Sequence, residues 1–430
     1  MTPSEPPAMP LIAPFAGLRP APGRAAEVLA PPYDVLDRAE ALGLAAERPW
    51  SFLHLSRPEI DLAPGVDPHS PAAYAQAAAR FARMRAARLL VREREPCYYC
   101  YRLSRGDQVQ TGLVLAASLA AYRAGRIRRH EVTLADKEDD RVRQIAALGA
   151  QTGPAYLIHS PSPAIDDTLA EITHAAPTLD STIADGTWDG VRHQLWVVSD
   201  QGAIERLTAG FEAQRRLYIA DGHHRTAAAA RIGAARQAAN PGHTGTEAYN
   251  RFLAVSFPAD QPRVLAVNRL VRDLQGGDAA TFLHRLGACG ALVPSAAPVS
   301  PGRRGEFGLY LDRAWYRLTL DHPDHHPSAG PRQDPAARLD VRLLQDQVLA
   351  PLLGIADPRQ DHRIGFVGGI RGLPGLMQQV DGGAWRLGFS LHPTALADLL
   401  ALADAGAVMP PKCTWFEPKP ADGVVSLVLD

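Results

Sequence analysis

The chain of 430 residues is 46% hydrophobic and 21% charged, which is typical of a soluble globular protein and long enough for two or three domains. Its 45 lysines and arginines nearly balance its 46 aspartates and glutamates, so no overall charge attracts nucleic acid or an anionic membrane. Four cysteines, no signal-peptide pattern and no apolar run of roughly twenty residues predict a cytoplasmic protein without a disulfide framework or a transmembrane helix.

The first part of the chain, up to about Glu95, is rich in proline and predicts loops mixed with short helices. The clearest helix is expected at residues 74–91, where alanine and arginine are abundant. Two strands follow around a tight turn, CYYCYRL at 97–103 and TGLVLAASL at 111–119.

Residues 125–148 are dense in charge and predict a loop that enters a helix near Asp139. Further strands are predicted at YLIHS, HQLWVVS, LYIA, FLAVSF and VLAVNRLV, and the proline-rich segment 322–335 is expected to be a loop or linker. An amphipathic helix at 339–354 precedes a strand, a turn, a second strand and a helix. This mixture, without an internal repeat, predicts an α/β (α+β) fold with mixed sheets rather than one doubly wound sheet.

The pentapeptide DGHHR at residues 221–225 lies between the strand LYIA and an alanine-rich helix. Gly222 permits a tight turn and a close approach of the backbone to a ligand. The first amides of the following helix have no intrahelical partner and carry partial positive charge, so this place suits an anion, above all a phosphate. Arg225 adds a fork of donors for phosphate oxygens, and His223 and His224 can each donate a further hydrogen bond.

Asp221 is open to three interpretations: it caps the helix, accepts a hydrogen bond from a substrate hydroxyl, or holds a magnesium ion. The structural alternative is that Asp221 is only an N-cap and that both histidines are polar surface residues. A resident metal site is not predicted, because adjacent histidines point in different directions and no H-x-x-x-H or paired-carboxylate spacing is present here.

A second cluster comprises Arg128, Arg129, His130 and Glu131, and a run of charges at 136–141 follows it. The alternative for this run is a solvated helix face, and its acidic residues argue against a nucleic-acid patch at the two arginines. Glu131 has a clearer functional interpretation. A carboxylate beside His130 in basic surroundings stays ionised and can accept a proton from a hydroxyl group.

The third cluster is MPPKCTWF at residues 409–416. Its two prolines favour a rigid, extended chain that presents Lys412 and Thr414 to a phosphate or a carboxylate. The alternative is that the segment is a C-terminal tail packed by Trp415 and Phe416.

In these clusters the sequence resembles the ParB/sulfiredoxin-like superfamily, and most closely its free serine kinases. Three features match in the same order. His130-Glu131 resembles the segment with the catalytic glutamate, DGHHR resembles the phosphate-binding motif, and Pro393-Thr394, a helix and PKCT at 411–414 resemble the end of those kinases. The whole chain also resembles a widespread uncharacterised prokaryotic family of similar length, which carries PPYDV, KEDDR, ADGHHR and MPPKxTWFEPK.

We expect three regions on this basis. An N-terminal region at 1–95 packs on the core, a ParB/sulfiredoxin-like catalytic domain at 96–320 holds the strand–DGHHR–helix motif, and a C-terminal α/β domain at 336–430 contributes to the site. The resemblance implies a phosphotransferase that makes O-phosphoserine from free L-serine with ATP or ADP and Mg²⁺, or that runs the reverse reaction.

The resemblance also assigns roles to residues of this chain. The catalytic group is Glu131 with His130 and Asp221, the phosphate or nucleotide group is Gly222, His223, His224 and Arg225, and the substrate group is Lys412 and Thr414. Two alternatives stay open. One is a ParB-like nucleotide-binding regulatory protein, for which the sequence lacks a DNA-binding helix pair and a basic face, and the other is a phosphohydrolase, in which water replaces the acceptor. The predicted partners are a nucleotide and a small-molecule substrate, without nucleic acid or membrane.

Overall fold

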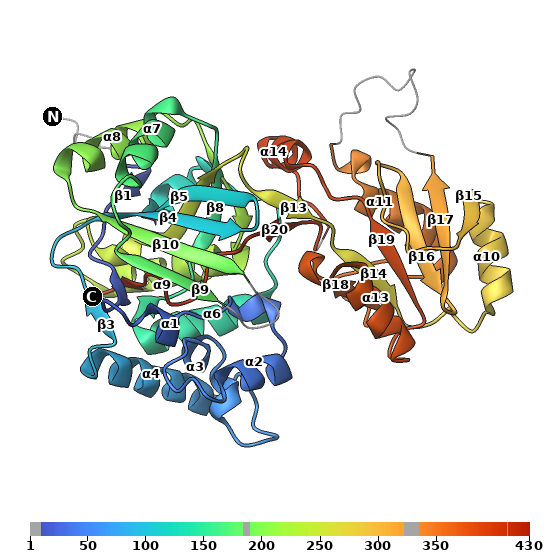
Figure 1. Ribbon diagram of the computed structural model, residues 1–430, viewed down its shortest axis with the longest axis horizontal. Coiled ribbons are helices and arrows are strands. Elements are labelled where there is room, and N and C mark those ends of the chain that lie inside the picture. Colours follow the sequence, from blue (N-terminus) through green and yellow to red (C-terminus); the bar gives the residue numbers. More distant parts are fainter. Residues whose placement is uncertain (1–9, 184–189, 322–334, 411) are drawn as a thin grey trace. The chain divides into compact units, whose positions relative to one another are not determined.

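The computed structural model has a mixed α/β fold, which confirms the predicted fold class (Figure 1). The residues that it describes are 10–183, 190–321, 335–410 and 412–430. The linker expected at 322–335 lies outside them, apart from its last residue. No helix among the described residues is long and apolar enough to cross a lipid bilayer.

The chain divides into two compact units. Unit 1 consists of the chain up to Arg129, Thr133–Pro262 and Pro418–Asp430. Unit 2 consists of His130–Val132 and Arg263–Glu417. The N-terminal region expected at 1–95 therefore falls in unit 1, and the last part of the expected C-terminal domain also returns to unit 1.

The core of unit 1 is a nine-stranded mixed sheet with the order β6-β11-β8-β12-β5-β4-β10-β9, in which β1 also pairs with β5. Its strands are β1 (Ile12–Ala13), β4 (Tyr98–Arg105), β5 (Gln108–Ser118), β6 (Ile127–Arg128), β8 (Ala155–His159), β9 (Leu179–Ile183), β10 (Val191–Val198), β11 (Leu217–Asp221) and β12 (Arg251–Pro258). The pairs β6–β11 and β8–β12 are parallel, and the other pairs are antiparallel. The hairpin expected at CYYCYRL and TGLVLAASL is β4–β5.

Apolar sequence runs explain why the central strands are buried. Every residue of β8 is buried, as is every residue of β12 after Arg251. A strand covered on both faces of a sheet is an unbroken hydrophobic run in the sequence. Helices α7 (Pro163–Ile172) and α8 (Gln201–Glu212) cover one face, while the N-terminal helices and α6 (Ala135–Leu148) lie on the opposite face (Figure 1).

The remaining elements of unit 1 come largely from the N-terminal region. The helices are α1 (Ala25–Val28), α2 (Arg38–Ala45), α3 (Leu53–Ser56), α4 (Pro71–Ala86), α5 (Leu119–Arg123) and α9 (His223–Ala239), with 3₁₀ turns η1 (Tyr33–Val35), η2 (Pro58–Asp61) and η3 (Ala248–Asn250). Two small antiparallel pairs join β2 (Leu18–Pro20) to β3 (Leu90–Arg92) and β7 (Ala150–Gln151) to β21 (Leu427–Val428). The helix expected at 74–91 is α4, which ends earlier because the chain then enters β3.

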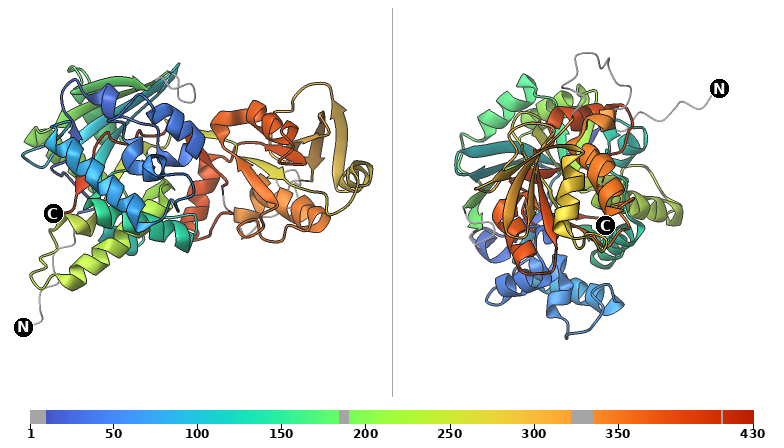
Figure 2. Two further views of the ribbon diagram at one scale, coloured as in Figure 1. Left: turned by 90° about the horizontal axis from the view of Figure 1, so that it is seen from below. Right: turned by 90° about the vertical axis from the view of Figure 1, so that its right-hand side faces the viewer.

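Unit 2 contains a six-stranded antiparallel sheet with the order β15-β17-β16-β19-β14-β18 (Figure 2). Its strands are β14 (Asn268–Val271), β15 (Gly290–Ser295), β16 (Glu306–Leu311), β17 (Ala314–Leu320), β18 (Ile364–Val367) and β19 (Leu387–Leu391). A separate pair joins β13 (Arg263–Leu265) to β20 (Trp415–Glu417). The helical elements are η5 (Pro335–Arg338), α10 (Ala279–Gly287), α11 (Asp340–Leu344), α12 (Ala350–Leu353), η7 (Gly369–Arg371), α13 (Gly372–Asp381) and α14 (Leu396–Asp404).

Three expectations for unit 2 need correction. The run VLAVNRLV forms two strands in different sheets, β13 and β14, rather than one. The helix expected at 339–354 contains a π-helical stretch, Gln345–Leu349, between α11 and α12. The turn expected between the last two strands contains α13, because its proline lies in the first turn of the helix, where the missing N–H is tolerated, and Leu376 and Val380 form a buried face.

Candidate functional site

The DGHHR segment forms a sharp turn from strand β11 into helix α9. Asp221 is the last residue of β11, and Gly222 follows it with φ 91° and ψ 27°, in the left-handed region. A Cβ atom at this glycine would lie 2.9 Å from Arg225 Nε and 3.1 Å from Ala155 Cα. Both the backbone angle and the close packing therefore require glycine here.

Asp221 is not the N-cap of α9, so the interpretation of this residue as a helix cap is wrong. Gly222 occupies the cap position, and no side chain caps the helix. The Asp221 carboxylate instead accepts the N–H of Gly222 at 2.8 Å through Oδ1 and the ammonium of Lys419 at 2.8 Å through Oδ2. It also lies 3.6 Å from Arg225 Nη2. Asp221 thus connects the turn to two cations.

Lys419 is a buried cation held between two carboxylates. Its Nζ donates to Asp221 and lies 3.4 Å from Asp34 Oδ2, and its side chain is 8% exposed. Burial alone would lower the pKa of this ammonium, but Asp221 and Asp34 outweigh burial and hold the pKa above its usual value. Lys419 is therefore charged at every physiological pH.

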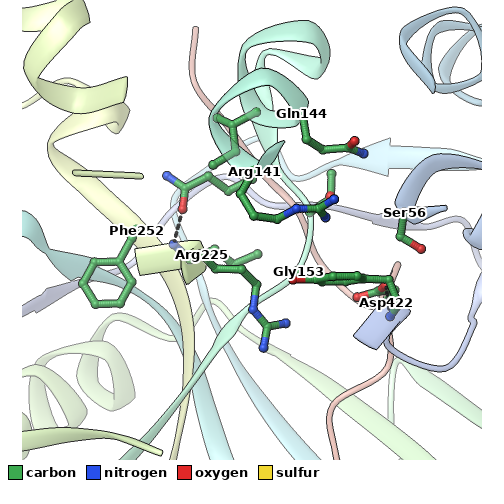
Figure 3. Close-up of a pocket in the computed structure, with 12 residues that line it drawn as sticks. Ser56, Arg141, Gln144, Gly153, Arg225, Phe252 and Asp422 are labelled. Atoms are coloured by element: carbon green, nitrogen blue, oxygen red, sulfur yellow. Dashed lines mark hydrogen bonds between the residues drawn. The ribbon is translucent and has the colours of Figure 1, made fainter. Parts of the chain in front are cut away.

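A small pocket lies beside this turn (Figure 3). Its lining residues are Tyr33, Ser56, Arg141, Gln144, Ile145, Gln151, Thr152, Gly153, Arg225, Phe252, Leu253 and Asp422. The cavity volume of ≈ 30 Å³ is enough for about two water molecules or a small part of a larger ligand. All of these residues belong to unit 1, and they come from six separate parts of the chain.

Arg225 is the most informative side chain of the pocket. It is only 14% exposed, and burial, which opposes its charge, is outweighed by Asp221 and other acidic neighbours that raise its pKa. Its Nε atom is buried and has no hydrogen-bond partner among the described residues. A buried donor without a partner is costly, so a ligand oxygen or an ordered water is expected to accept this N–H.

Arg141 supplies a second guanidinium to the pocket. Its Nε donates to Asp140 at 2.9 Å, and its guanidinium stacks over the ring of Tyr33 at 4.3 Å. Asp140 also accepts the hydroxyl of Tyr74 at 2.6 Å and is 2.9 Å from Nδ1 of His69. The interpretation of the run at 136–141 as a solvated helix face is therefore wrong for its last two residues, which helix α4 and its N-terminal neighbours hold in place.

Asp422 contributes a buried carboxyl group with a raised pKa to the same pocket. It is 2% exposed, its backbone pairs with that of Ala30, and its Oδ2 accepts the N–H of Tyr33 at 3.2 Å. A Cβ atom at Gly153 would lie 3.4 Å from both Asp422 Oδ1 and Arg225 Nη1, so the two side chains approach each other there. Burial raises the pKa of Asp422 to about 6, although Arg225 opposes the shift.

Gln144 adds an unpaired acceptor. Its side chain is 4% exposed, its Nε2 donates to the carbonyl of Leu55, and its Oε1 is buried without a partner in the described part of the chain. The pocket thus combines two guanidinium donors with a carboxyl and an amide oxygen. Such a set suits a ligand that is mainly anionic and also has hydrogen-bond donors.

The two histidines of DGHHR have different environments. His223 is 4% exposed, so its interpretation as a surface residue is wrong. His224 accepts the backbone N–H of Leu134 through Nε2 at 3.0 Å, which fixes the chain just before α6. Thr226 is buried and donates its hydroxyl to the carbonyl of Gly222 at 3.2 Å. In this arrangement Nε2 of His224 is an acceptor and is not available to donate to a phosphate.

His130 and Glu131 of the second predicted cluster lie in unit 2 with the third cluster, whereas Arg128 and Arg129 belong to unit 1. The carbonyl of His130 accepts the N–H of Met409 at 2.8 Å. Burial raises the pKa of Cys413 to about 12, and the nearby Glu131 carboxylate acts in the same direction. Lys412 is exposed with φ 54°, and Pro411 lies outside the described residues.

Sequence reasoning missed four residues of the unit 1 site: Asp34, Arg141, Lys419 and Asp422. The first three lie in PPYDV, KEDDR and FEPK, segments that support the resemblance to an uncharacterised family but suggested no chemistry by themselves. No motif or pattern in the sequence indicated a functional role for Asp422. The structure brings these segments together around DGHHR.

A resident magnesium site is not built into the described residues, because no group of three or more potential ligands is present among them. The carboxylates of Asp34 and Asp221, which lie beside the DGHHR turn, already share the ammonium of Lys419. Magnesium bound to a nucleotide needs only one or two protein carboxylates, so the ion would arrive with the nucleotide substrate.

The fold and the site define an α/β protein with a cluster of partly buried charges around a strand–glycine–helix turn. The chain belongs to the family described as "Protein of unknown function (DUF1015)", whose model matches residues 12–342. This agrees with the resemblance to an uncharacterised family seen in the sequence. No curated protein is significantly similar to the chain.

Several solved structures are similar to the chain at low identity. One is a free serine kinase mutant in complex with AMP, at 12% identity over 73% of this chain and 89% of that chain, with a TM-score of 0.33. Another is a conserved hypothetical protein from Pyrococcus furiosus, at 12% identity over 75% and 96%, with a TM-score of 0.35. SbnI from Staphylococcus aureus is 10% identical over 72% and 85%, with a TM-score of 0.37. Because these TM-scores are low, the function is inferred from the site itself.

Proposed function

We propose that the chain is a cytoplasmic phosphotransferase that binds ATP or ADP with Mg²⁺ and transfers a phosphoryl group to the hydroxyl of free L-serine or a similar small molecule. The reverse reaction, from phosphoserine, uses the same site. The observation that carries this proposal is the buried guanidinium of Arg225. It lines the pocket beside Arg141, directly after the glycine turn that opens α9.

Charge and geometry at the turn support the binding of a phosphate group. The first amides of α9 carry partial positive charge, which favours an anion at this end of the helix. Arg225 adds a rigid fork of donors at the same place. Positioning and charge stabilisation supply most of the rate in phosphoryl transfer, so a site of this kind can serve both binding and catalysis.

In the proposed reaction the substrate hydroxyl oxygen forms a bond to the terminal phosphorus of the nucleotide, and the bond from that phosphorus to its bridging oxygen breaks. The nucleotide product is ADP when ATP is the donor and AMP when ADP is the donor. The hydroxyl proton passes to a carboxylate, a role proposed for Glu131 with His130 beside it. Lys412 and Thr414 are proposed to bind the carboxylate or phosphate of the amino acid.

Asp422 is a second candidate for the proton acceptor. Its carboxyl group lines the pocket, and its pKa of about 6 is close to the pH at which a general base works best. Glu131→Gln and Asp422→Asn distinguish the two candidates. The variant that removes the base should lower the transfer rate at least about 100-fold while the protein still binds ADP.

The experiment is phosphorus NMR of the protein with Mg²⁺, L-serine and ATP or ADP, run beside phosphoserine with ADP. A phosphoserine signal, or loss of phosphoserine with formation of ATP, is the expected result. The matched control is Glu205→Gln, an exposed glutamate on α8, which should keep the wild-type rate.

Two other results would reject the proposal. Release of inorganic phosphate at the same rate with and without serine would indicate a phosphohydrolase. Tight nucleotide binding without any turnover of serine or phosphoserine would favour a nucleotide-binding regulatory protein.

A further inference from the structure

Two essential members of the unit 1 site come from one short segment near the end of the chain. We call residues 418–422 the strap. Lys419 of the strap donates to Asp221 at 2.8 Å, and the carboxyl group of Asp422 lines the pocket beside Arg225. Any movement of the strap would change the charges around Arg225.

Buried side chains of the central sheet hold the strap on either side of Lys419. Gln110, on β5, donates its Nε2 to the carbonyl of Pro418 at 2.8 Å. The hydroxyl of Tyr101, on β4, accepts the N–H of Ala421 at 3.2 Å. Gln110 is 0% exposed and Tyr101 is 1% exposed, so water does not compete for these bonds.

Tyr101 is itself held by a buried histidine. Its hydroxyl is 2.6 Å from Nδ1 of His193, which is 0% exposed. Burial lowers the pKa of His193 to about 3, so the ring is neutral at physiological pH. With the ring neutral, Tyr101 can donate its hydroxyl proton to Nδ1, and its oxygen keeps a lone pair for the N–H of Ala421.

We propose that Tyr101 and His193 are positioning residues that hold the strap in place, and through it Lys419 and Asp422. The identity of the ligand at the site rests on the proposed function, but the positioning role does not. The positioning role predicts that the Tyr101 side chain, on the sheet, controls whether the ammonium group of Lys419 stays buried.

The composition of the chain makes this role directly measurable. Only three lysines are present: Lys137, Lys412 and Lys419. The first two are exposed, whereas Lys419 is 6% exposed and bonded to Asp221. Acylation by a succinimidyl ester, followed by mass spectrometry of the three peptides, therefore compares one buried lysine with two exposed internal references.

In the wild-type protein Lys419 should remain unlabelled while the other two lysines react. Tyr101→Phe leaves the N–H of Ala421 without its acceptor, and labelling of Lys419 should become about tenfold faster relative to the two references. The matched control is Tyr98→Phe. That hydroxyl is also buried but pairs with Thr208, so its loss should leave Lys419 protected.

Variants of His193 separate positioning from general destabilisation. His193→Leu removes the acceptor for Tyr101 and should expose Lys419, whereas His193→Asn keeps an acceptor near Nδ1 and should restore protection. His159 is an equally buried histidine whose Nδ1 is 2.8 Å from Ser256, so His159→Leu is the matched control.

Three results would overturn the proposal: equal protection of Lys419 in Tyr101→Phe and the wild type, equal labelling in His193→Leu and His159→Leu, or ready labelling of Lys419 in the wild type. Because no nucleotide or serine is present, failure of this test is distinct from failure of the phosphotransferase proposal, which the NMR experiment decides.

Discussion

Arg225 lies in a set of partly buried charges in which each cation faces carboxylates. The cations are Arg141, Arg225 and Lys419, and the nearby carboxylates are Asp34, Asp140, Asp221 and Asp422. Removing one of these cations leaves its carboxylate partners charged and unpaired, which usually destabilises a protein more than the pair had stabilised it. We therefore expect conservative variants to report on binding more cleanly than alanine variants do.

Asp422 leads to a prediction about stability and pH. Its pKa is about 6 in the folded protein and ~4 in an unfolded chain, so the folded state binds an extra proton between these values. This contribution to stability is complete below pH ~4 and is lost as the pH rises through about 6. Asp422→Asn should therefore raise the free energy of unfolding at pH 7.5 relative to the wild type, by up to about 3 kcal/mol, with no gain near pH 4.

Urea denaturation at pH 4.0, 5.5 and 7.5 measures this difference. Asp107→Asn, at the exposed tip of the β4–β5 hairpin, is the control and should show no such change with pH. A stability gain from Asp422→Asn that is the same at all three pH values would contradict the account of this buried carboxyl group.

At the scale of single elements, the turn between β11 and α9 positions Arg225. Gly222→Ala places a side chain in the left-handed region and pushes its Cβ against Arg225 and the backbone of Ala155. The loss of stability should exceed about 2 kcal/mol, and affinity for ADP should fall as Arg225 is displaced.

Gly149 provides the comparison for this variant. It ends α6 with φ 62°, and nothing lies within 4 Å of a Cβ atom built on it. Gly149→Ala should therefore cost about 1 kcal/mol from its backbone angle alone and leave ADP affinity unchanged. Thermal unfolding of both variants measures the loss of stability, and calorimetric titration measures their affinity for ADP. Equal effects on ADP binding would show that the packing at Gly222 has no special role.

Much of the fold follows from patterns within the sequence. The apolar runs at FLAVSF and YLIHS form buried strands, and the hairpin β4–β5 and helix α14 form where turn residues and helical periodicity place them. Errors arose where glycine and proline suggested a turn but α13 formed, and where Arg263–Val271 divides between two sheets. In both cases packing with distant segments outweighs the local signal.

The candidate site was only partly predictable for a related reason. DGHHR has local physical meaning, since a glycine turn before a helix suits an anion wherever it occurs. The residues that pair with this motif have no such local signal, because they are distant in sequence. Lys419 is 198 residues from Asp221 and 385 residues from Asp34 along the chain. Periodicity identifies which face of an element is buried, but it does not identify which distant charge faces it.

At the scale of the whole molecule, the central claim is that the unit 1 pocket binds the phosphate of a nucleotide through Arg225. The most direct measurement is calorimetric titration of ADP with Mg²⁺ into the wild type, Arg225→Lys and Arg231→Ala. Arg231 lies on the same helix, but it is half exposed, pairs with Glu138 and Asp139, and does not line the pocket.

Arg231→Ala should bind ADP like the wild type. Arg225→Lys, which keeps the charge but loses the fork of donors, should bind about 10- to 100-fold more weakly. Equal affinity of Arg225→Lys and the wild type, or no binding of ADP by the folded wild-type protein, would contradict the account.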